Sequence, residues 1–376
     1  MIEGLRASLD AWNADGAPEL HAALEDLLGG CGVRGRLVSA GRVRRDRVMR
    51  IGVEIDGQLR SLIVKRFAPD RARRERDAIE RWLPSVGLEA QGPPLLARAA
   101  DRSGRFAWFA YEDLGDCTLA ERSADPQATQ AAVGLVAELH ARFTEQPLLA
   151  EVRSLGGDLG IAFTAASVRD ASRALRALAS RASLTPPQRA LCARLLERIE
   201  LLRAEQAVRA EMLAECGGPE TLLHGDLWTI NVLVRSVAGG LETRLIDWDH
   251  AGVGPVSYDL SAFLMGFASE ARDPLLSRYR EGYEKSSNTS PRWPSRAEWN
   301  ALFDTAERAR LANAVVWRTL AALDGHVAWA FDELAWYDAA FAALGPVLPG
   351  APRALAEGGD ARATAPEPAL AQGGAL

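Results

Sequence analysis

The sequence predicts an α+β protein of two lobes: a small antiparallel β-sheet lobe with one main helix, then a larger, mostly helical lobe. Short apolar runs separated by turn residues occupy the segment 33–111, a pattern that is typical of paired strands. From Thr118 onward the apolar residues recur at helical spacing instead. The chain has 376 residues and 48% hydrophobic content, which is enough for two buried cores.

The β-sheet lobe is predicted from its turn signals and alternating strands. Asp56-Gly57 is a two-residue hairpin signal between two alternating runs. A helix over residues 70–83, which Pro84 ends, separates an earlier group of three strands from a later pair. The strands are expected at residues 33–40, 48–55, 58–67, 95–100 and 106–111.

Helices are predicted on both sides of this lobe. Pro18 begins one whose leucines share a face and which Gly29-Gly30 ends. After the lobe, residues 128–143 are amphipathic, and residues 165–214 form a long helical pair. The predicted divisions are a helical extension at 1–32, the β-sheet lobe at 33–113, the helical lobe at 114–345 and a disordered, Ala-, Gly- and Pro-rich tail at 346–376.

Composition excludes several function classes. The net charge of −6 lacks the basic footprint of a nucleic-acid binder, so no nucleic-acid partner is expected. The four cysteines are widely spaced without a CxxC pair, which argues against a zinc site or a disulfide framework. No apolar run reaches membrane-spanning length and no signal peptide is evident, so we expect a cytoplasmic protein without a membrane partner. Monomer and homodimer both stay open.

Two short stretches carry the chemistry. The first, HGDLWTINVLV at residues 224–234, holds Asp226 and Asn231, and the second, LIDWDHAG at residues 245–252, holds Asp247. An Asp with an Asn supplies hard oxygen ligands that suit Mg²⁺ and its bound phosphates. A further Asp, kept off the metal, can accept a proton from an incoming hydroxyl. Together these residue types indicate phosphoryl transfer.

A lysine adds to this prediction. Lys65 and Lys285 are the only lysines in the chain, and Lys65 lies on a predicted strand. Glu75 follows on the next predicted helix, in the order expected of a lysine that grips phosphates and a glutamate that holds it. Glu80 lies on the same helix at a nearby register, so either glutamate could be the partner of Lys65.

The two stretches at this spacing resemble the aminoglycoside phosphotransferase and choline kinase group, whose fold is similar to that of protein kinases. EDLG at 112–115 and LHA at 139–141 resemble the linker between the lobes of that group and the helix after it. The resemblance covers about residues 33–345. It implies a kinase that uses Mg²⁺ and transfers the γ-phosphoryl group of ATP or GTP to a hydroxyl of a small molecule.

The resemblance also implies roles for individual residues. Asp226 matches the catalytic Asp that orients or deprotonates the acceptor hydroxyl, and Asn231 and Asp247 match the metal ligands. The expected nucleotide-binding residues are Lys65, Glu75, Tyr111 and Asp113, the last two through main-chain groups near the base. The expected supporting residues, of which Asp259 and His224 brace the catalytic loop, are His224, Asp249 and Asp259.

Three features depart from the family pattern or have two interpretations. The segment expected to cover the nucleotide, SAGRVRRDR at 39–47, has one glycine, and the arginines within Arg42–Arg47 either replace backbone phosphate contacts or are solvated. His250 has no assigned role. Residues 326–341 mix tryptophans and carboxylates, which suits a cationic or sugar-like acceptor or, alternatively, a packed helix with a polar edge.

The acceptor is the least defined part of the prediction. It is expected to be an amine- or sugar-bearing compound, possible classes being an antibiotic, which would make the protein a resistance enzyme, or a metabolite of the choline, homoserine or sugar type. The helical pair at 165–214 is placed where the family forms part of its acceptor site. A nucleotide-binding pseudokinase is the alternative from another class. A protein kinase is disfavoured because the loop reads HGD and the sequence contains no Asp-Phe-Gly segment.

Overall fold

The computed structural model describes the chain from Ile2 to Gly350 with short gaps. The described residues are 2–12, 15–29, 35–44, 47–287, 289, 291–325 and 327–350. They form two compact units: unit 1 consists of residues up to 160 and 218–291, and unit 2 consists of residues 161–217 and those from 292 on. These units divide the chain differently from the lobes predicted at 33–113 and 114–345, whose boundaries stay predictions.

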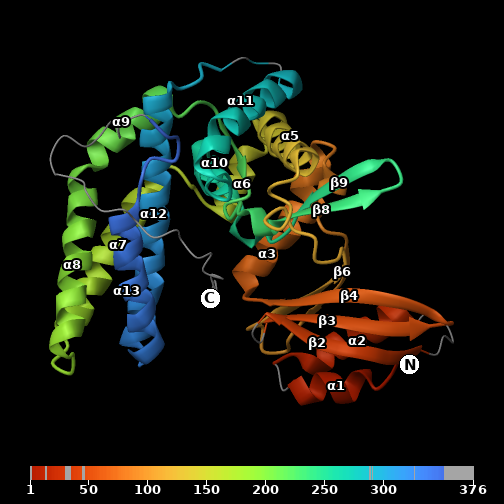
Figure 1. Ribbon diagram of the computed structural model, residues 1–376. Coiled ribbons are helices and arrows are strands. Elements are labelled where there is room, and N and C mark those ends of the chain that lie inside the picture. Colours follow the sequence, from red (N-terminus) through yellow and green to blue (C-terminus); the bar gives the residue numbers. More distant parts are fainter. Residues whose placement is uncertain are drawn as a thin grey trace. The chain divides into compact units, whose positions relative to one another are not determined.

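Unit 1 contains a six-stranded sheet in the order β1-β2-β3-β4-β6-β5 (Figure 1). All neighbouring strands are antiparallel except β1 and β2, which pair in parallel. This confirms the predicted α+β class and the antiparallel lobe. The strands are β1 (Ile2–Glu3), β2 (Gly35–Arg44), β3 (Val48–Ile55), β4 (Gln58–Phe67), β5 (Leu95–Ala100) and β6 (Ala107–Glu112).

Two N-terminal helices, α1 (Leu5–Trp12) and α2 (Ala17–Gly29), cover one face of this sheet. One helix was predicted in this segment, so the prediction was incomplete. The helix α1 is short and has too few apolar residues to give a clear helical pattern in the sequence. Leu62 and Val64 of β4 belong to the core under α1 and α2. Since side chains alternate along a strand, Lys65 is directed to the opposite face.

The helix after β4 is longer than the predicted 70–83. It starts as α3 (Pro69–Asp77), continues through a π-helical turn at Ala78–Trp82 and ends with α4 (Leu83–Ser85). Pro84 is accommodated in the short last helix, where its missing N–H costs little. Glu75 lies on the buried side of α3.

The remainder of unit 1 is helical with short strands. Strand β7 pairs with β10, and β8 pairs with β9, each antiparallel. The helix predicted at 128–143 is α5. The elements are α5 (Pro126–Phe143), α6 (Leu149–Gly156), β7 (Glu220–Leu223), β8 (Val232–Val237), β9 (Gly240–Leu245), β10 (Gly252–Pro255), α10 (Ser257–Met265) and α11 (Ser269–Ser286).

Unit 2 is a bundle in which α7, α8, α12 and α13 pack side by side (Figure 1). Thr185 and Ser295 each form a capping box that defines the start of a long helix. The helices are α7 (Ile161–Ala179), α8 (Pro186–Ala204), α9 (Gln206–Cys216), α12 (Arg296–Leu323) and α13 (Val327–Ala343). Throughout the described residues, none of the helices combines the length and apolarity needed to cross a membrane.

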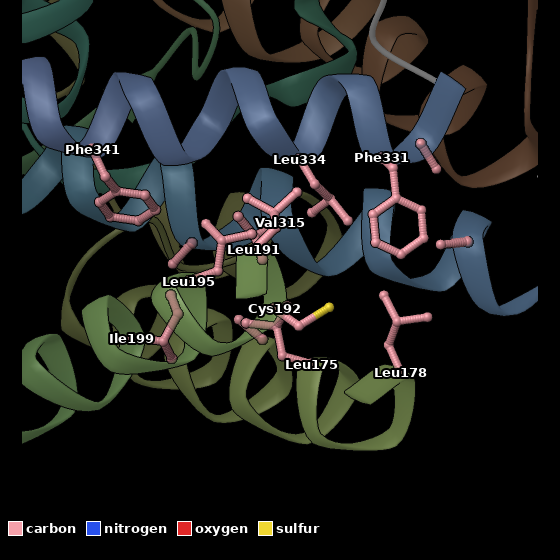
Figure 2. Close-up of a cluster of buried hydrophobic side chains, with 14 of the residues drawn as sticks. Leu175, Leu178, Leu191, Cys192, Leu195, Ile199, Val315, Phe331, Leu334 and Phe341 are labelled. Carbon is pink, nitrogen blue, oxygen red and sulfur yellow. The ribbon is translucent and has the colours of Figure 1, made fainter. Parts of the chain in front are cut away.

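Apolar side chains from all four long helices form the core of unit 2. Leu175, Leu195, Val315 and Leu334 are buried between the helices (Figure 2). Each of the four long helices therefore supplies an apolar face to this core.

The start of the predicted tail at 346–376 is packed rather than extended into solvent. Val347 and Leu348 are buried. Asn300 of α12 donates to the carbonyl of Leu348 at 2.9 Å and accepts from its N–H at 2.8 Å. The rest of the predicted tail, from residue 351, lies outside the described residues.

We expect truncation of a core leucine in unit 2 to destabilise it much more than truncation of a surface leucine in the same helix. Leu195 is fully buried, whereas Leu201 is 60% exposed. Leu195→Ala should lower the free energy of unfolding by about 2–4 kcal/mol, and Leu201→Ala by less than about 0.5 kcal/mol. Denaturant unfolding measures both values, and equal losses would contradict the described packing of α8.

Candidate functional site

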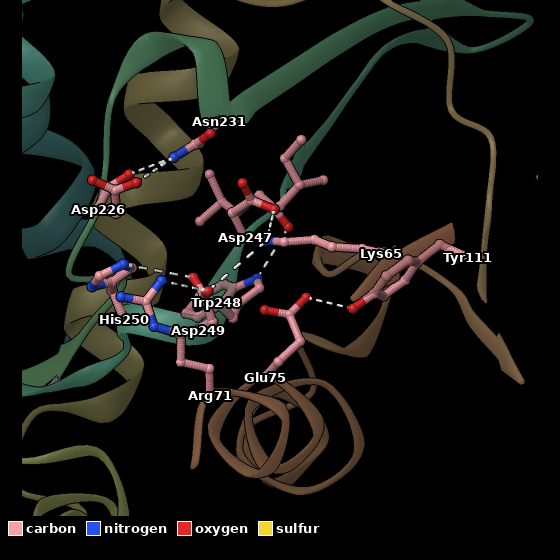
Figure 3. A network of polar contacts seen from close by, with 12 residues as sticks. Lys65, Arg71, Glu75, Tyr111, Asp226, Asn231, Asp247, Trp248, Asp249 and His250 are labelled. Carbon is pink, nitrogen blue, oxygen red and sulfur yellow. Dashed lines mark hydrogen bonds and ion pairs between the residues drawn. The ribbon is translucent and has the colours of Figure 1, made fainter. Parts of the chain in front are cut away.

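The candidate catalytic residues lie on the loop between β7 and β8. Asn231 donates from Nδ2 to the main-chain oxygen of Asp226 at 2.8 Å and to its Oδ2 at 3.1 Å (Figure 3). The N–H of Trp228 also donates to the Asp226 carbonyl, at 2.8 Å. The loop is thus closed on itself, and the other carboxylate oxygen of Asp226 accepts no hydrogen bond from the described chain.

Gly225 makes this loop possible. Its φ is +82°, and a Cβ at this position would overlap the main-chain carbonyl of His250. Only glycine tolerates such a backbone with so close an approach. The carbonyl of His250, a residue without an assigned role, therefore helps to set the distance between the two motif segments.

A buried carboxylate braces the same loop. Asp259, in the first turn of α10, accepts from the N–H of His224 at 2.7 Å and from the N–H of Gly225 at 2.9 Å. His140 of α5 lies 3.3 Å from Asp259 Oδ2 through Nε2 and 3.0 Å from the hydroxyl of Tyr279 through Nδ1. Burial raises the pKa of Asp259, but the hydrogen bond and charge of His140, together with His224 and its N–H, lower it below its usual value.

The ring of His224 joins the two motif segments. Its Nε2 lies 2.8 Å from the carbonyl oxygen of Ile246, and its Nδ1 accepts from the N–H of Asp226 at 3.3 Å. The ring also packs on Trp248 with centroids 4.7 Å apart. Nε2 is placed to donate to this carbonyl, while Nδ1 acts as the acceptor. The structure places His224 and Asp259 where a loop brace is needed.

Lys65 contacts the second motif segment. Its Nζ lies 2.6 Å from Asp247 Oδ1 and 4.0 Å from Asp249 Oδ2 (Figure 3). Asp247 has a left-handed backbone with φ 68° and ψ 56°. Burial lowers the pKa of Lys65, but the carboxylates of Asp247 and Asp249 outweigh it and raise the pKa above its usual value. Lys65 is therefore a paired cation.

The predicted pair of Lys65 and Glu75 is not formed. Glu75 is buried and accepts from the hydroxyl of Tyr111 at 2.9 Å, and its Oε2 has no hydrogen-bond partner. Glu80, the other candidate, pairs with Arg98 at 3.1 Å. Burial raises the pKa of Glu75 to about 8, although Lys65 opposes this shift. A largely neutral carboxyl has little attraction for an ammonium, which accounts for the different partners.

Asp249 is held by arginines that the sequence analysis did not identify as part of the site. Arg74 donates from Nη1 to the Asp249 carbonyl at 2.8 Å, and Arg71 lies 3.6 Å from Asp249 Oδ2. Burial raises the pKa of Asp249, but Lys65, His250 and the two arginines lower it below its usual value. Arg71 and Arg74 are three residues apart, which predicts that they share one face of the helix. The sequence does not show that this face of α3 is directed toward Asp249.

The predicted linker residue Asp113 is anchored through its side chain. It accepts from Ser61 at 2.6 Å and from the N–H of Gly115 at 2.9 Å, and it pairs with Arg50 at 2.7 Å. Burial raises the pKa of Asp113, but the hydrogen bonds of Ser61, Gly115 and Arg50 lower it below its usual value. This network fixes the start of the linker to β3 and β4.

The predicted metal ligands fit a cation in their chemistry. Asp247 supplies a partly exposed carboxylate, and the amide oxygen of Asn231 accepts no hydrogen bond from the described chain. Within the described ranges, no group of three or more His, Cys, Asp or Glu side chains is placed to hold a metal. A Mg²⁺ ion here would accordingly depend on Asp247, Asn231, water and phosphate oxygens, as magnesium commonly does.

The glycine-poor segment 39–47 is mostly strand rather than loop. Strand β2 extends to Arg44, with the Arg42 side chain exposed. Residues 45 and 46 lie outside the described residues, as does the side chain of Arg44. Arg47 is partly buried, and burial together with the charges of Arg71 and Arg66 lowers its pKa. Arg47 therefore differs from a solvated hairpin arginine.

The aromatic and acidic segment 326–341 behaves mainly as a packed helix with a polar edge. Asp338 pairs with Arg194 and Arg198, and Glu333 pairs with Arg318. Arginines already balance the negative charge of these two carboxylates. This weakens the alternative interpretation, in which the segment binds a cationic acceptor. Trp329 and Trp336 are 37% and 47% exposed on the same helix. His326 lies outside the described residues.

Comparison with known proteins identifies relatives. A sequence profile of the phosphotransferase enzyme family matches residues 46–299. Among solved structures, an ethanolamine kinase from Plasmodium vivax gives a TM-score of 0.54 at 12% identity and covers 81% of either chain. A spectinomycin phosphotransferase solved with ADP and spectinomycin gives 0.52 at 12% identity, covering 85% of this chain and 98% of that one.

A third structure, a complex with GDP and kanamycin, gives a TM-score of 0.50 at 13% identity and covers 86% of this chain and 98% of that one. A search of curated protein sequences finds no significant match. At these identities the structural similarity concerns the fold, and it confirms the predicted kinase-like fold.

We expect Gly225→Ala to destabilise the catalytic loop. The left-handed backbone alone costs an alanine about 1–2 kcal/mol, and overlap with the His250 carbonyl adds to it. Gly104→Ala is the matched control, because Gly104 has φ +70° and no atom near a Cβ. Thermal unfolding should show a clearly larger loss for Gly225→Ala. Equal losses would mean that backbone handedness alone sets the cost.

Protonation of Glu75 should make stability depend on pH. The folded pKa of about 8 lies above the unfolded value of 4.5, so between these values the unfolded chain has released a proton that the folded chain keeps. The free energy of unfolding should therefore fall as pH rises from about 5 to 8, by on the order of a few kcal/mol. Glu75→Gln, which mimics the neutral form, should lack this slope in denaturant unfolding.

Glu80→Gln is the control for this measurement, since the Glu80 side chain lies on the same helical stretch but is 40% exposed and pairs with Arg98. It should reproduce the wild-type dependence on pH. If Glu75→Gln shows the same slope as the wild type, Glu75 is ionised in the folded protein and the assigned direction of its pKa shift is wrong.

Proposed function

Because this chain belongs to the phosphotransferase enzyme family, we propose that it transfers the γ-phosphoryl group of ATP or GTP to a hydroxyl of an amine- or sugar-bearing small molecule. The observation that carries this proposal is the closed loop in which Asn231 fixes Asp226 while one Asp226 carboxylate oxygen stays open to an acceptor. A loop held this firmly, next to the Lys65–Asp247 pair, suits positioning of two reactants.

In the proposed reaction the acceptor oxygen bonds to the γ-phosphorus while the bond from that phosphorus to the β–γ bridging oxygen breaks. The nucleoside diphosphate leaves with the electron pair of the broken bond. Asp226 orients the hydroxyl and takes its proton, a role that needs the carboxylate ionised and within hydrogen-bond reach. The brace of Asp259 on the adjacent N–H groups supports this role, because it limits the motion of Asp226.

Donor binding is assigned to the opposite side of the site. Lys65 is proposed to neutralise donor phosphates, and main-chain groups from Tyr111 to Asp113 to meet the base. Asp247 and Asn231 would hold Mg²⁺, which when bound neutralises charge on the phosphates. The partly exposed Asp247 carboxylate and the unengaged Asn231 amide oxygen support this assignment.

The acceptor class is inferred from the compounds named for the structural relatives. The structural relatives include an ethanolamine kinase and a spectinomycin phosphotransferase, whose named compounds carry both amines and hydroxyls. We propose an acceptor of this kind, an antibiotic or a metabolic alcohol. The neutralised carboxylates of Glu333 and Asp338 do not favour α13 as the part that recognises a cation.

We expect Asp226→Asn to lower turnover by about 10²–10⁴-fold while nucleotide affinity stays unchanged, since the amide keeps the shape but cannot accept the proton. The measurement is nucleoside diphosphate release with ATP and with GTP across amino-sugar, macrolide, nucleoside and peptide antibiotics, choline, ethanolamine and homoserine. Mass spectrometry then locates the added phosphoryl group.

Asp10→Asn, on the exposed face of α1, is the control and should behave as the wild type. Acceptor-stimulated release that persists in Asp226→Asn would refute the assigned role of Asp226. Tight nucleotide binding with no release for any acceptor would instead favour a nucleotide-binding regulator that does not turn over.

A further inference from the structure

Helix α3 reaches the site through two arginines that the proposed reaction does not use. Arg74 donates to the main-chain oxygen of Asp249. Arg71 lies beside the Asp249 carboxylate (Figure 3). Asp249 follows Asp247 by two residues, within the 3₁₀ turn Trp248–His250. Both arginines therefore act on the short segment that presents Asp247 to Lys65.

This segment needs support from outside itself. Asp247 has a left-handed backbone, which costs a non-glycine residue about 1–2 kcal/mol. The Asp249 side chain is 8% exposed, and a buried carboxylate without cationic partners is strongly destabilising. Arg71 and Lys65 supply these partners, and Arg74 donates to the carbonyl of Asp249 within the 3₁₀ turn.

The glutamates of the same helical stretch do not provide this link. Glu75 is bound to Tyr111, and Glu80 to Arg98. Of the neighbouring arginines, Arg73 is exposed and Arg76 pairs with the adjacent Asp77. Among these charged residues of the described α3 and the π-helical turn, Arg71 and Arg74 are the ones that contact the Asp247 segment.

We propose that Arg71 and Arg74 are positioning residues that hold the Asp247 segment in its metal-binding conformation, linking α3 to the site where the sequence predicted a Lys65–Glu75 pair. The inference rests on the proposed function, in which Asp247 holds Mg²⁺. Residues that orient a metal ligand from the next layer commonly change metal affinity by 10–100-fold.

The test is binding of ADP and of GDP, each with and without Mg²⁺, measured by calorimetry on the full chain. The double variant Arg71→Gln, Arg74→Gln should lose about tenfold or more of the affinity gained with Mg²⁺. Its affinity for the metal-free nucleotide should match the wild type. Arg74→Lys keeps a cationic donor and should retain most of the gain, and it also tests the inference if the double variant fails to fold.

Arg73→Gln is the matched control on the same helix and should bind as the wild type. Amide hydrogen exchange over residues 247–251 gives a second readout. The double variant should exchange faster there than the wild type and the Arg73→Gln control. Equal loss of affinity with and without Mg²⁺ would mean that the arginines contact the phosphates directly, and it would overturn the inference, as would unchanged binding and exchange.

The two readouts also separate this inference from the proposed function. If wild-type nucleotide binding does not respond to Mg²⁺, the metal role of Asp247 fails and the inference fails with it. Faster exchange in the double variant would then identify the arginines as supports of local structure alone.

Discussion

The buried carboxylate of Asp259 is the constraint on which the catalytic loop depends. A charge removed from water is tolerated only when hydrogen bonds and opposite charge surround it. Asp259 obtains them from the N–H groups of His224 and Gly225 and from the ring of His140. Each carboxylate oxygen takes one of the two N–H groups, so the peptide units just before Asp226 are fixed in position and in orientation. The hydrogen bonds that stabilise the buried charge of Asp259 thereby also orient Asp226, the residue assigned to the acceptor.

The direction of the Lys65 side chain depends on the burial of its apolar neighbours on β4. The core under α1 and α2 takes Leu62 and Val64, which leaves Lys65 on the other face of β4 because side chains alternate. There Nζ lies 4.5 Å above the ring of Phe67, which also limits its rotation. N-terminal helices far from Lys65 in sequence thus determine which way this lysine, the residue assigned to the phosphates, faces.

Much of this arrangement could be predicted, because the signals involved are local. The Asp56-Gly57 hairpin, the amphipathic residues 128–143 and the spacing of the two motifs each depend on neighbours in the sequence, and the structure has the corresponding elements. The choice of partner for Lys65 depends instead on tertiary distances. Several carboxylates fall near one ammonium, and the pKa of each depends on its burial together with the cations around it.

Glu75 illustrates why the partner of Lys65 could not be predicted from the sequence. Glu75 follows Lys65 in the order expected for an ion pair. Its carboxyl instead accepts a hydrogen bond from Tyr111, which is distant in the sequence. The arginines of α3 were missed for a related reason. A run such as Arg71 to Arg76 resembles a solvated face, and only the packing of α3 against the Trp248–His250 turn separates the inward arginines from Arg73.

These contacts lead to a view of how charge is balanced during the proposed reaction. With Glu75 largely neutral, Lys65 is paired chiefly with Asp247. In that reaction, donor phosphates would be additional anionic partners for Lys65, and Asp247 would be one of the residues that hold the accompanying cation. Each buried charge would then keep a partner throughout, which avoids the desolvation cost of an isolated charge. Such an exchange requires Asp247 to keep its backbone conformation while its ion pair is broken. A segment held from α3 through the Asp249 carbonyl and carboxylate meets this requirement, because its anchors do not include Asp247 itself.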